Sequence, residues 1–147
     1  MRKVMRPRFY CEFCNKGSGS GGHMRKHETR CTLNPLRECG MCAHLGLEQP
    51  DLQSLIAMLP NPEPFKREVT DFVWTHWAGL EEAVDAVMPK LRAVTVCPAC
   101  ILAAIRLRGI PAPEITSFKF KDEMKALLDA ENARAYEEEI ERERHQL

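Results

Sequence analysis

The chain has no apolar run long enough to cross a membrane and no net charge that would favour one class of partner. A membrane span needs roughly 18 to 20 apolar residues, and the 21 Lys and Arg residues balance 21 Asp and Glu residues. The first segment, MRKVMRPRFY, is basic but lacks the apolar run and cleavage site of a secretory leader. We therefore expect a cytoplasmic protein with no membrane contact.

Signatures of catalysis are also missing from the sequence. It contains no glycine-rich phosphate loop, no Ser/His/Asp order and no metal-hydrolase motif. Acidic runs such as Glu81/Glu82 and residues 137–139 are typical of solvated helix faces. We expect a protein with no active site and no small-molecule substrate.

The cysteines do not have the even count of a secreted disulfide framework. There are seven, and six of them form three Cys-x-x-Cys pairs. Disulfide frameworks in secreted domains have even counts and wider spacing. The pattern instead indicates reduced thiols that bind metal.

The first group of ligand-type residues has the spacing C-x2-C-x12-H-x3-C, formed by Cys11, Cys14, His27 and Cys31. Zinc takes four tetrahedral ligands, which a Cys-x-x-Cys turn and two residues one helical turn apart supply in pairs. The loop length favours His27 and Cys31 as the second pair. His23 lies one turn before His27, so a His23/His27 pair that leaves Cys31 free is the alternative.

Residues 9–31 resemble the zinc-finger family in its Cys-Cys-His-Cys form. Phe9 matches the aromatic two places before the first cysteine, and Met24 stands where the family has a helix leucine. The segment departs from the family at Ser18, which replaces a core phenylalanine, and in its many glycines, which favour neither a hairpin nor a helix start. The rest of the chain resembles no family as a whole.

Basic residues concentrate in the same segment, since residues 1–31 hold eight Lys and Arg against two acids. The family's base-reading positions fall on Ser20, His23 and Lys26, none of which is the Arg or Asn that makes the strongest base contacts. Sequence-specific reading is therefore not expected. Two interpretations are left: the basic residues contact the phosphates of DNA or RNA, or they form a solvated basic end without a partner. The candidate residues are Arg6, Arg8, Arg25, Lys26 and Arg30.

Two further knuckles, Cys39/Cys42 and Cys97/Cys100, supply a second set of four ligands. A shared metal would tie the ends of the 54 residues between Cys42 and Cys97 into one unit. Four thiolates leave no open position for water, so the expected role is structural. His44 is an alternative fourth ligand, although its spacing after Cys42 is awkward.

A competing interpretation begins from the segment VTVCPACILAAIRLRGI, which resembles the strand, Cys-Pro-x-Cys and helix of the glutaredoxin and thioredoxin families. It implies that Cys97 is a nucleophilic thiolate and Cys100 the resolving thiol. The residues after 113 read as one helix and offer no further strands, and the Cys39/Cys42 knuckle would be left without a purpose. Zinc is therefore preferred over redox chemistry.

The remaining pattern is helical. Asp51 can cap a helix through Leu59, and the break LPNPEPF follows it. We predict core helices, a short strand over 93–96, a helix over 101–108, and a long C-terminal helix capped by Thr116 or Ser117. The core positions predicted at helical spacing are Phe65, Val69, Phe72, Val73, Trp74, Trp77, Leu80, Val84, Val87 and Leu91. The C-terminal stripe is Phe120, Met124, Leu127, Leu128, Tyr136 and Ile140.

Together these features predict a mainly α, zinc-stabilised protein in three parts: a zinc-finger-like basic segment (1–36), a helical four-cysteine zinc domain (37–112) and an amphipathic C-terminal helix (113–147). Two zinc ions are expected. The favoured function is a non-enzymatic adaptor that touches nucleic acid through 1–31 and a protein, or its own copy, through 117–147. The alternatives are a structural or assembly component, since the chain is similar in appearance to short zinc proteins of bacteriophages and would then occupy the host cytoplasm or virion, and a thiol-disulfide oxidoreductase that uses Cys97 and Cys100.

Overall fold

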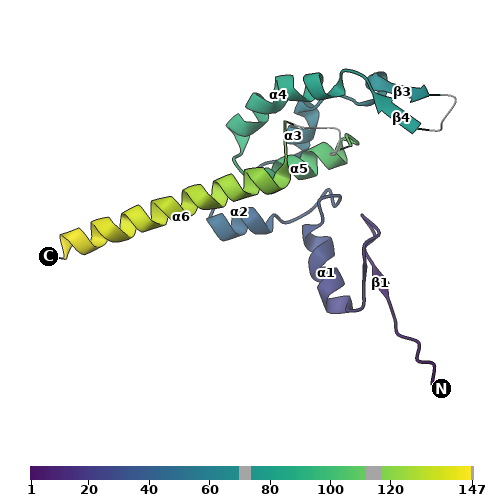
Figure 1. Cartoon of the computed structure of the whole chain (residues 1–147), viewed down its shortest axis with the longest axis horizontal. Helices are drawn as coiled ribbons and strands as arrows, with labels where there is room; N and C mark the ends of the chain where they lie inside the picture. The colour runs from purple at the N-terminus through teal and green to yellow at the C-terminus, as the bar shows by residue number, and fades with distance from the viewer. Residues whose placement is uncertain (70–73, 112–116, 147) are drawn as a thin grey trace.

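The protein is mainly α-helical and is described here from a computed structural model that places residues 1–69, 74–111 and 117–146. In Figure 1 an N-terminal unit, a central helical body and a projecting C-terminal helix follow one another, and the two chain ends lie far apart. The helices are α1 (Gly21–Arg30), α2 (Gly40–Leu45), α3 (Leu52–Met58), η1 (Glu63–Phe65, a 3-10 turn), α4 (Leu80–Val94), α5 (Pro98–Leu107) and α6 (Phe120–His145). The strands are β1 (Phe9–Tyr10), β2 (Gly17–Ser18), β3 (Lys66–Val69) and β4 (Trp74–Trp77). Along these described ranges no helix is both long and apolar enough to cross a bilayer.

The N-terminal unit (residues 1–36) is built from a two-stranded ribbon and one helix. β1 pairs antiparallel with β2, so that Phe9 lies opposite Ser18. Ser20 caps α1 by accepting the N–H of His23 at 3.3 Å. The side chain of Asn34 donates to the carbonyl of Glu28 at 2.8 Å and helps to close the helix end. The glycines thus permit both a hairpin and a helix, contrary to expectation, because the Ser20 cap supports the helix start.

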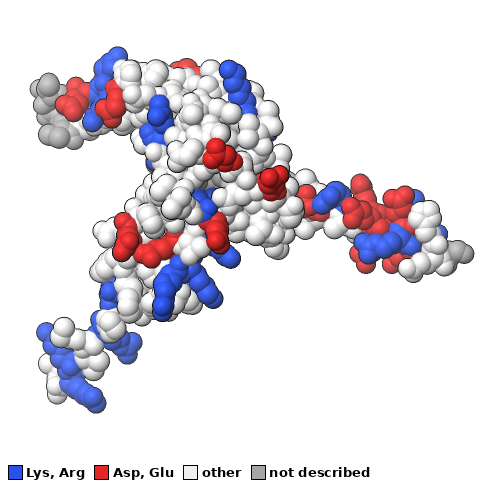
Figure 2. Space-filling view, turned by 180° about the vertical axis from the view of Figure 1, so that it is seen from behind, with Lys and Arg blue, Asp and Glu red and all other residues white. Residues whose placement is uncertain are grey.

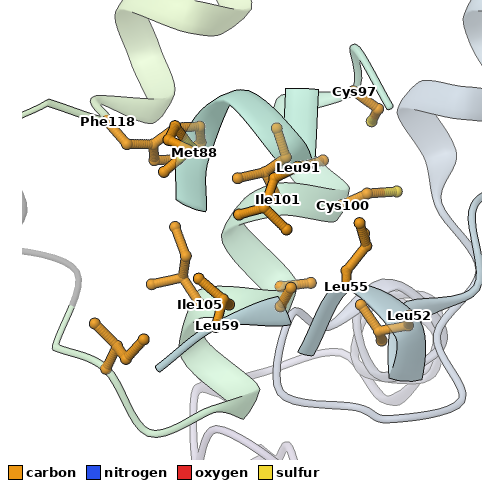
Figure 3. Packing of buried hydrophobic residues seen from close by; sticks show 14 of the residues in the cluster. Leu52, Leu55, Leu59, Met88, Leu91, Cys97, Cys100, Ile101, Ile105 and Phe118 are labelled. Atoms are coloured by element: carbon orange, nitrogen blue, oxygen red, sulfur yellow. The ribbon is translucent and has the colours of Figure 1, made fainter. Parts of the chain in front are cut away.

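The helical body (residues 37–110) holds the main core, which lies between α3, α4 and α5. Leu55, Leu91 and Ile105, one from each helix, are fully buried. Figure 3 shows the side chains of α3 facing those of α5, with Leu91 and Phe118 on the same cluster. Asp51 caps α3 through the N–H of Gln53, as predicted. The four cysteines of the second group belong to this core cluster.

The predicted helix through residues 65–77 is wrong. β3 and β4 form an antiparallel hairpin in which Lys66 pairs with Trp77, and Trp74 is 55% exposed and not part of the core. Phe65 and Trp77 do pack partly against the core. The segment is rich in β-branched and aromatic residues, which favour a pleated surface over a helix. Phe72 and Val73 lie outside the described residues.

Two smaller predictions also need correction. The strand expected over 93–96 is absent from that described stretch, because α4 continues to Val94 and only then becomes extended at Thr95. The C-terminal helix begins at Phe120 with no side-chain cap, later than predicted. Thr116 lies outside the described residues, and the hydroxyl of Ser117 instead donates to Asp85. Helix starts without a capping side chain leave no sequence signal at the boundary.

α6 has two different halves. Its first turns pack on α5 and are held by an ion pair between Arg92 and Glu123. Its last turns are exposed, with Tyr136 at 66% exposure, and extend away from the body in Figure 1. The predicted apolar stripe therefore packs only at its beginning, and the charged end projects.

Candidate metal centres

The first ligand group lies at the junction of the ribbon and α1. Cys11 and Cys14 occupy the turn after β1, His27 lies in the last turn of α1, and Cys31 is the C-cap of that helix. Their ligand atoms all lie within 4.8 Å of one another. The Sγ of Cys14 is 3.1 Å from Nε2 of His27. Cys11 and Cys31 are almost completely buried.

Local backbone structure aims both pairs at one point. In the turn, the N–H of Cys11 donates to the carbonyl of Lys16 and that of Asn15 to the carbonyl of Cys11, each at 2.9 Å. Asn15 has a φ of 59°, a left-handed conformation that Asn tolerates better than most residues. His27 and Cys31, four residues apart, share one side of the helix end. The turn and the helix therefore present two ligands each.

The second group consists of two knuckles with the same local geometry. Cys39 is the N-cap of α2 (φ −81°, ψ 108°), and Cys97 is the N-cap of α5 (φ −77°, ψ 109°). Cys42 and Cys100 each follow one turn into these helices. Two helix N-termini, which carry partial positive charge, thus lie beside the four sulfurs.

The distances in this group fit a tetrahedral metal ion. Cys39 Sγ lies 3.5 Å from Cys97 Sγ, and Cys42 Sγ lies 3.6 Å from Cys100 Sγ. Four sulfurs about 2.3 Å from a central zinc would be about 3.8 Å apart, whereas a disulfide bond is about 2.05 Å long. All four cysteines are free and buried. Donor type, spacing and burial therefore suit metal in both groups and suggest two ions.

In the absence of a cation, contacts within each group keep most of these thiols protonated and favour ionisation of one of the second group, Cys39. Burial, together with the neighbouring Cys97 thiol, raises the pKa of Cys42 to about 12. Hydrogen bonds from Cys100 and Cys97 lower the pKa of Cys39 far below its ordinary value, while the same contacts raise that of Cys100. In the first group burial raises the pKa of Cys31. A bound divalent cation would displace the thiol protons and stabilise all four ligands in their deprotonated form.

Two supporting residues hold the knuckles and were not predicted from the sequence. The N–H of Cys97 donates to Oγ1 of Thr95 at 3.1 Å, and the N–H of Cys39 donates to Oε1 of Gln49 at 2.6 Å. The Thr95 contact is local, since the two residues are two positions apart, and the sequence Thr-x-Cys could have indicated it. Gln49 is ten residues away from Cys39, so no short-range pattern reveals it.

Thr95→Val is expected to weaken the second centre, because valine has the same shape but leaves the N–H of Cys97 without an acceptor in a buried position. Loss of such a partner costs about 1–3 kcal/mol, and loss of an outer-shell hydrogen bond commonly reduces metal affinity about 10- to 100-fold. Urea unfolding and competition with a chelator measure the two effects. Thr95→Ser, which retains the hydroxyl, is the control and should hold metal like the parent. Equal metal affinity for Thr95→Val and the parent would show that this hydrogen bond does not support the knuckle.

The chain between the two groups links them. Arg37 is buried, and its guanidinium donates from Nε and Nη2 to the carbonyl of Arg30 at the end of α1, both at 3.3 Å. The carbonyl of Arg37 in turn accepts from Nε2 of Gln49 at 2.9 Å. A second link runs from the Arg106 guanidinium to the Thr32 hydroxyl. The two candidate centres are therefore braced against each other.

The other predicted ligands and contact residues take different places. His23 and His44 are exposed and lie outside both ligand groups, so neither alternative ligand is brought to a centre. Arg6 and Arg8 precede or adjoin β1. Arg25, Lys26 and Arg30 are exposed on α1. In Figure 2 Lys and Arg side chains gather over the N-terminal unit, with acidic side chains at its border.

Fold and sites together define a small, mainly α protein with two Cys/His groups suited to binding metal. Comparison with protein-family models, curated proteins and solved structures finds no match to this chain. Residues 9–31 have the ligand arrangement of a metal-binding segment, and no family is identified for them.

Proposed function

We propose that the protein is a non-enzymatic zinc-binding adaptor whose N-terminal unit contacts nucleic acid without sequence specificity. The observation that carries the proposal is the pair of compact, four-ligand groups, one with three thiols and an imidazole and one with four thiols. Each set already fills the four positions of a tetrahedral ion, which leaves no site for a reactive water. Structural metal centres of this kind position surfaces for binding.

Zinc is the metal best suited to both sets, because thiolate and imidazole ligands in tetrahedral arrangement select zinc or an iron–sulfur cluster, and a cluster would need more room than 4.8 Å between all ligand atoms. Native mass spectrometry with elemental analysis tests this. Two zinc ions per chain are the expected result. One ion, none, or iron would contradict the proposal.

Nucleic-acid contact is supported by the distribution of charge. The exposed Lys and Arg residues of 1–31 form a basic end on a protein with no net charge. Figure 2 places this end opposite the mixed, acid-rich end of α6. Contacts from such side chains to phosphates carry no sequence information and weaken with salt.

Replacing Arg25, Lys26 and Arg30 by glutamine is expected to abolish salt-dependent retention of the protein on a nucleic-acid column. Loss of three phosphate contacts should reduce the salt dependence of log K by about 2–3 units of slope. The matched control carries the same change at Arg134, Arg142 and Arg144 on α6, which alters net charge equally. Equal retention of the two triple variants would show that only net charge matters and would contradict a site on α1.

A protein-binding role is supported by the exposed half of α6, where Tyr136 and a charged run lie on the surface. The alternative function, a structural or assembly component, rests on the same surface and differs in needing no nucleic acid. Stoichiometric association with a partner or with its own copy, in the absence of nucleic-acid retention, would favour this alternative. Size-exclusion chromatography with light scattering measures self-association.

The thiol-disulfide oxidoreductase is less well supported. A nucleophilic cysteine must be reachable, but Cys97 is fully buried and lies among three other cysteines. Reduction of an insulin disulfide that is abolished by Cys97→Ser would nevertheless establish it. We expect no such activity while zinc is bound.

A further inference from the structure

A hollow of about 400 Å³ opens on the N-terminal unit, between β1 and α1. One wall is formed by three consecutive residues, Arg8, Phe9 and Tyr10. The other is a single stripe of α1 that runs through Gly21, Met24/Arg25 and Glu28, positions that share one side of a helix. The lining contains no candidate ligand of either metal group, although Met24 belongs to the buried cluster that holds Cys11 and Cys31.

The hollow exists because the ribbon and the helix carry little bulk where they face each other. Gly21 has no side chain, and a Cβ placed there would lie 3.4 Å from the ring of Phe9. Ser18, opposite Phe9 in the ribbon, is small, and its hydroxyl accepts the N–H of Ser20. Met24 lines the hollow from the helix side and is buried.

Aromatic surface and positive charge lie on both faces of β1 beside the hollow: Phe9 faces α1, whereas Arg8 and Tyr10, its two neighbours along the strand, lie over Gly17 on the opposite face. Phe9 is 41% exposed and Tyr10 is 55% exposed, unusually open for aromatic rings beside a small core. The guanidinium of Arg8 and the ring of Tyr10 lie together over Gly17, where an added Cβ would come within 2.8 Å and 3.1 Å of them. Arg25 adds a second cation at the helix wall.

One acid, Glu28, lines the hollow, and its carboxylate takes part in a hydrogen bond. The carboxylate of Glu28 accepts the backbone N–H of Glu12 at 3.0 Å. This contact directs one carboxylate oxygen toward the cysteine turn. The basic residues Arg8 and Arg25 therefore outnumber the acid, and the exposed basic segment before β1 continues the positive surface.

We infer that the rim of this hollow binds an unstacked base of single-stranded nucleic acid, with the exposed ring of Tyr10 as the stacking surface, Arg8 beside that ring, and Arg25 across the hollow on a flanking phosphate. An aromatic ring beside cations suits single strands, whose bases expose their π-faces, whereas the bases of a duplex are stacked and out of reach. The inference rests on the proposed function and specifies it: the phosphates supply non-specific attraction, and stacking on the Tyr10 ring selects single strands.

Fluorescence anisotropy with a labelled single strand of about 12 nucleotides, within the usual site sizes of single-strand binders, and with its duplex tests the inference on the full, zinc-loaded chain. The single strand is expected to bind more tightly. Tyr10→Ala should weaken single-strand binding on the order of 10-fold, the loss of one base-stacking contact, and leave duplex binding unchanged. Tyr10→Phe keeps the ring and should bind like the parent. Tyr136→Ala removes the other tyrosine, on α6, and should have no effect.

Each other outcome has a definite meaning. Equal binding of both nucleic acids, unaffected by Tyr10→Ala but lost when Arg25, Lys26 and Arg30 are neutralised, would overturn the hollow and leave the proposed function standing. No binding of either would overturn both, and capture of a peptide in its place would make the hollow a protein site. Because Tyr10→Ala could disturb the fold, photo-crosslinking of a halogenated single strand to the unaltered protein provides a second test. Crosslinks are expected at Phe9 or Tyr10, and crosslinks only at Trp74 or Trp77 would overturn the inference.

Discussion

Cys100→Ser is expected to release the metal of the second centre and to unfold the helical body. Cys100 lies at the start of α5, is 2% exposed, and belongs to the same cluster as the core leucines and isoleucines. Structural zinc in finger-like peptides contributes about 10–16 kcal/mol of apparent binding free energy. Whole domains are stable by only about 5–15 kcal/mol. Loss of a ligand therefore removes an amount comparable to the entire stability of the protein.

Far-UV circular dichroism, thermal unfolding and native mass spectrometry measure the result. Cys100→Ser should show reduced helicity and at most one bound zinc. Ile105→Val, on the same helix and equally buried, removes one methylene from the core and should cost about 0.5–1.5 kcal/mol with both zinc ions retained. This contrast separates metal loss from a packing defect. Native helicity with full stability in Cys100→Ser would mean that the apolar core alone holds the body together.

Ligand grouping was the most predictable feature of this molecule, because metal coordination places strict demands on spacing. The interval between Cys14 and His27 indicated a loop that returns to the turn, and the two Cys-x-x-Cys knuckles indicated a contact across 54 residues. The choice between His23 and Cys31 was less certain from spacing. In the structure Cys31 lies at the end of α1 and within 4.8 Å of the other three candidate ligands, a group that does not include His23.

The secondary structure of residues 65–77 was mispredicted because the spacing of their apolar residues suits a helix whereas the residue types favour strands. Aromatic and β-branched residues in 65–77 recur at intervals of three and four, which suits a helix, yet the same residue types favour strands, and the hairpin β3–β4 forms instead. Trp74 consequently lies on the surface. A large aromatic residue at helical spacing indicates burial only if the helix is real, so the error in secondary structure became an error in the predicted core. The hollow beside Tyr10 could not be predicted either, since it depends on how closely Gly21 allows the helix to approach the ribbon.

His27→Ala is expected to unfold the N-terminal unit while the helical body remains folded. The unit has almost no apolar core of its own, since its buried cluster is Cys11, Met24 and Cys31, of which two are ligands. α1 is 10 residues long, shorter than the roughly 12–15 residues at which isolated helices become even marginally stable. Without metal, its end would be held by a few hydrogen bonds, among them those from Arg37 and Asn34 and that of the Glu38 N–H to the carbonyl of Thr29. These cannot offset the backbone entropy of the unit, which costs about 1–2 kcal/mol per ordered residue.

Amide hydrogen exchange followed by NMR resolves the two parts of the chain. In His27→Ala the amides of α1 should exchange at the rates of an unfolded peptide, those of α3 and α5 should stay protected, and native mass spectrometry should find one zinc ion instead of two. His23→Ala is the matched control, because it removes an exposed histidine from the same helix and should leave both ions and all protection in place. Simultaneous loss of protection in α1 and α5 would contradict selective unfolding and show that the link through Arg37 and Gln49 makes the two centres fold as one. The experiment therefore measures how strongly the unfolding of the two centres is coupled. If both unfold together, Gln49→Leu in the same background would show whether the hydrogen bonds of Gln49 are responsible for that coupling.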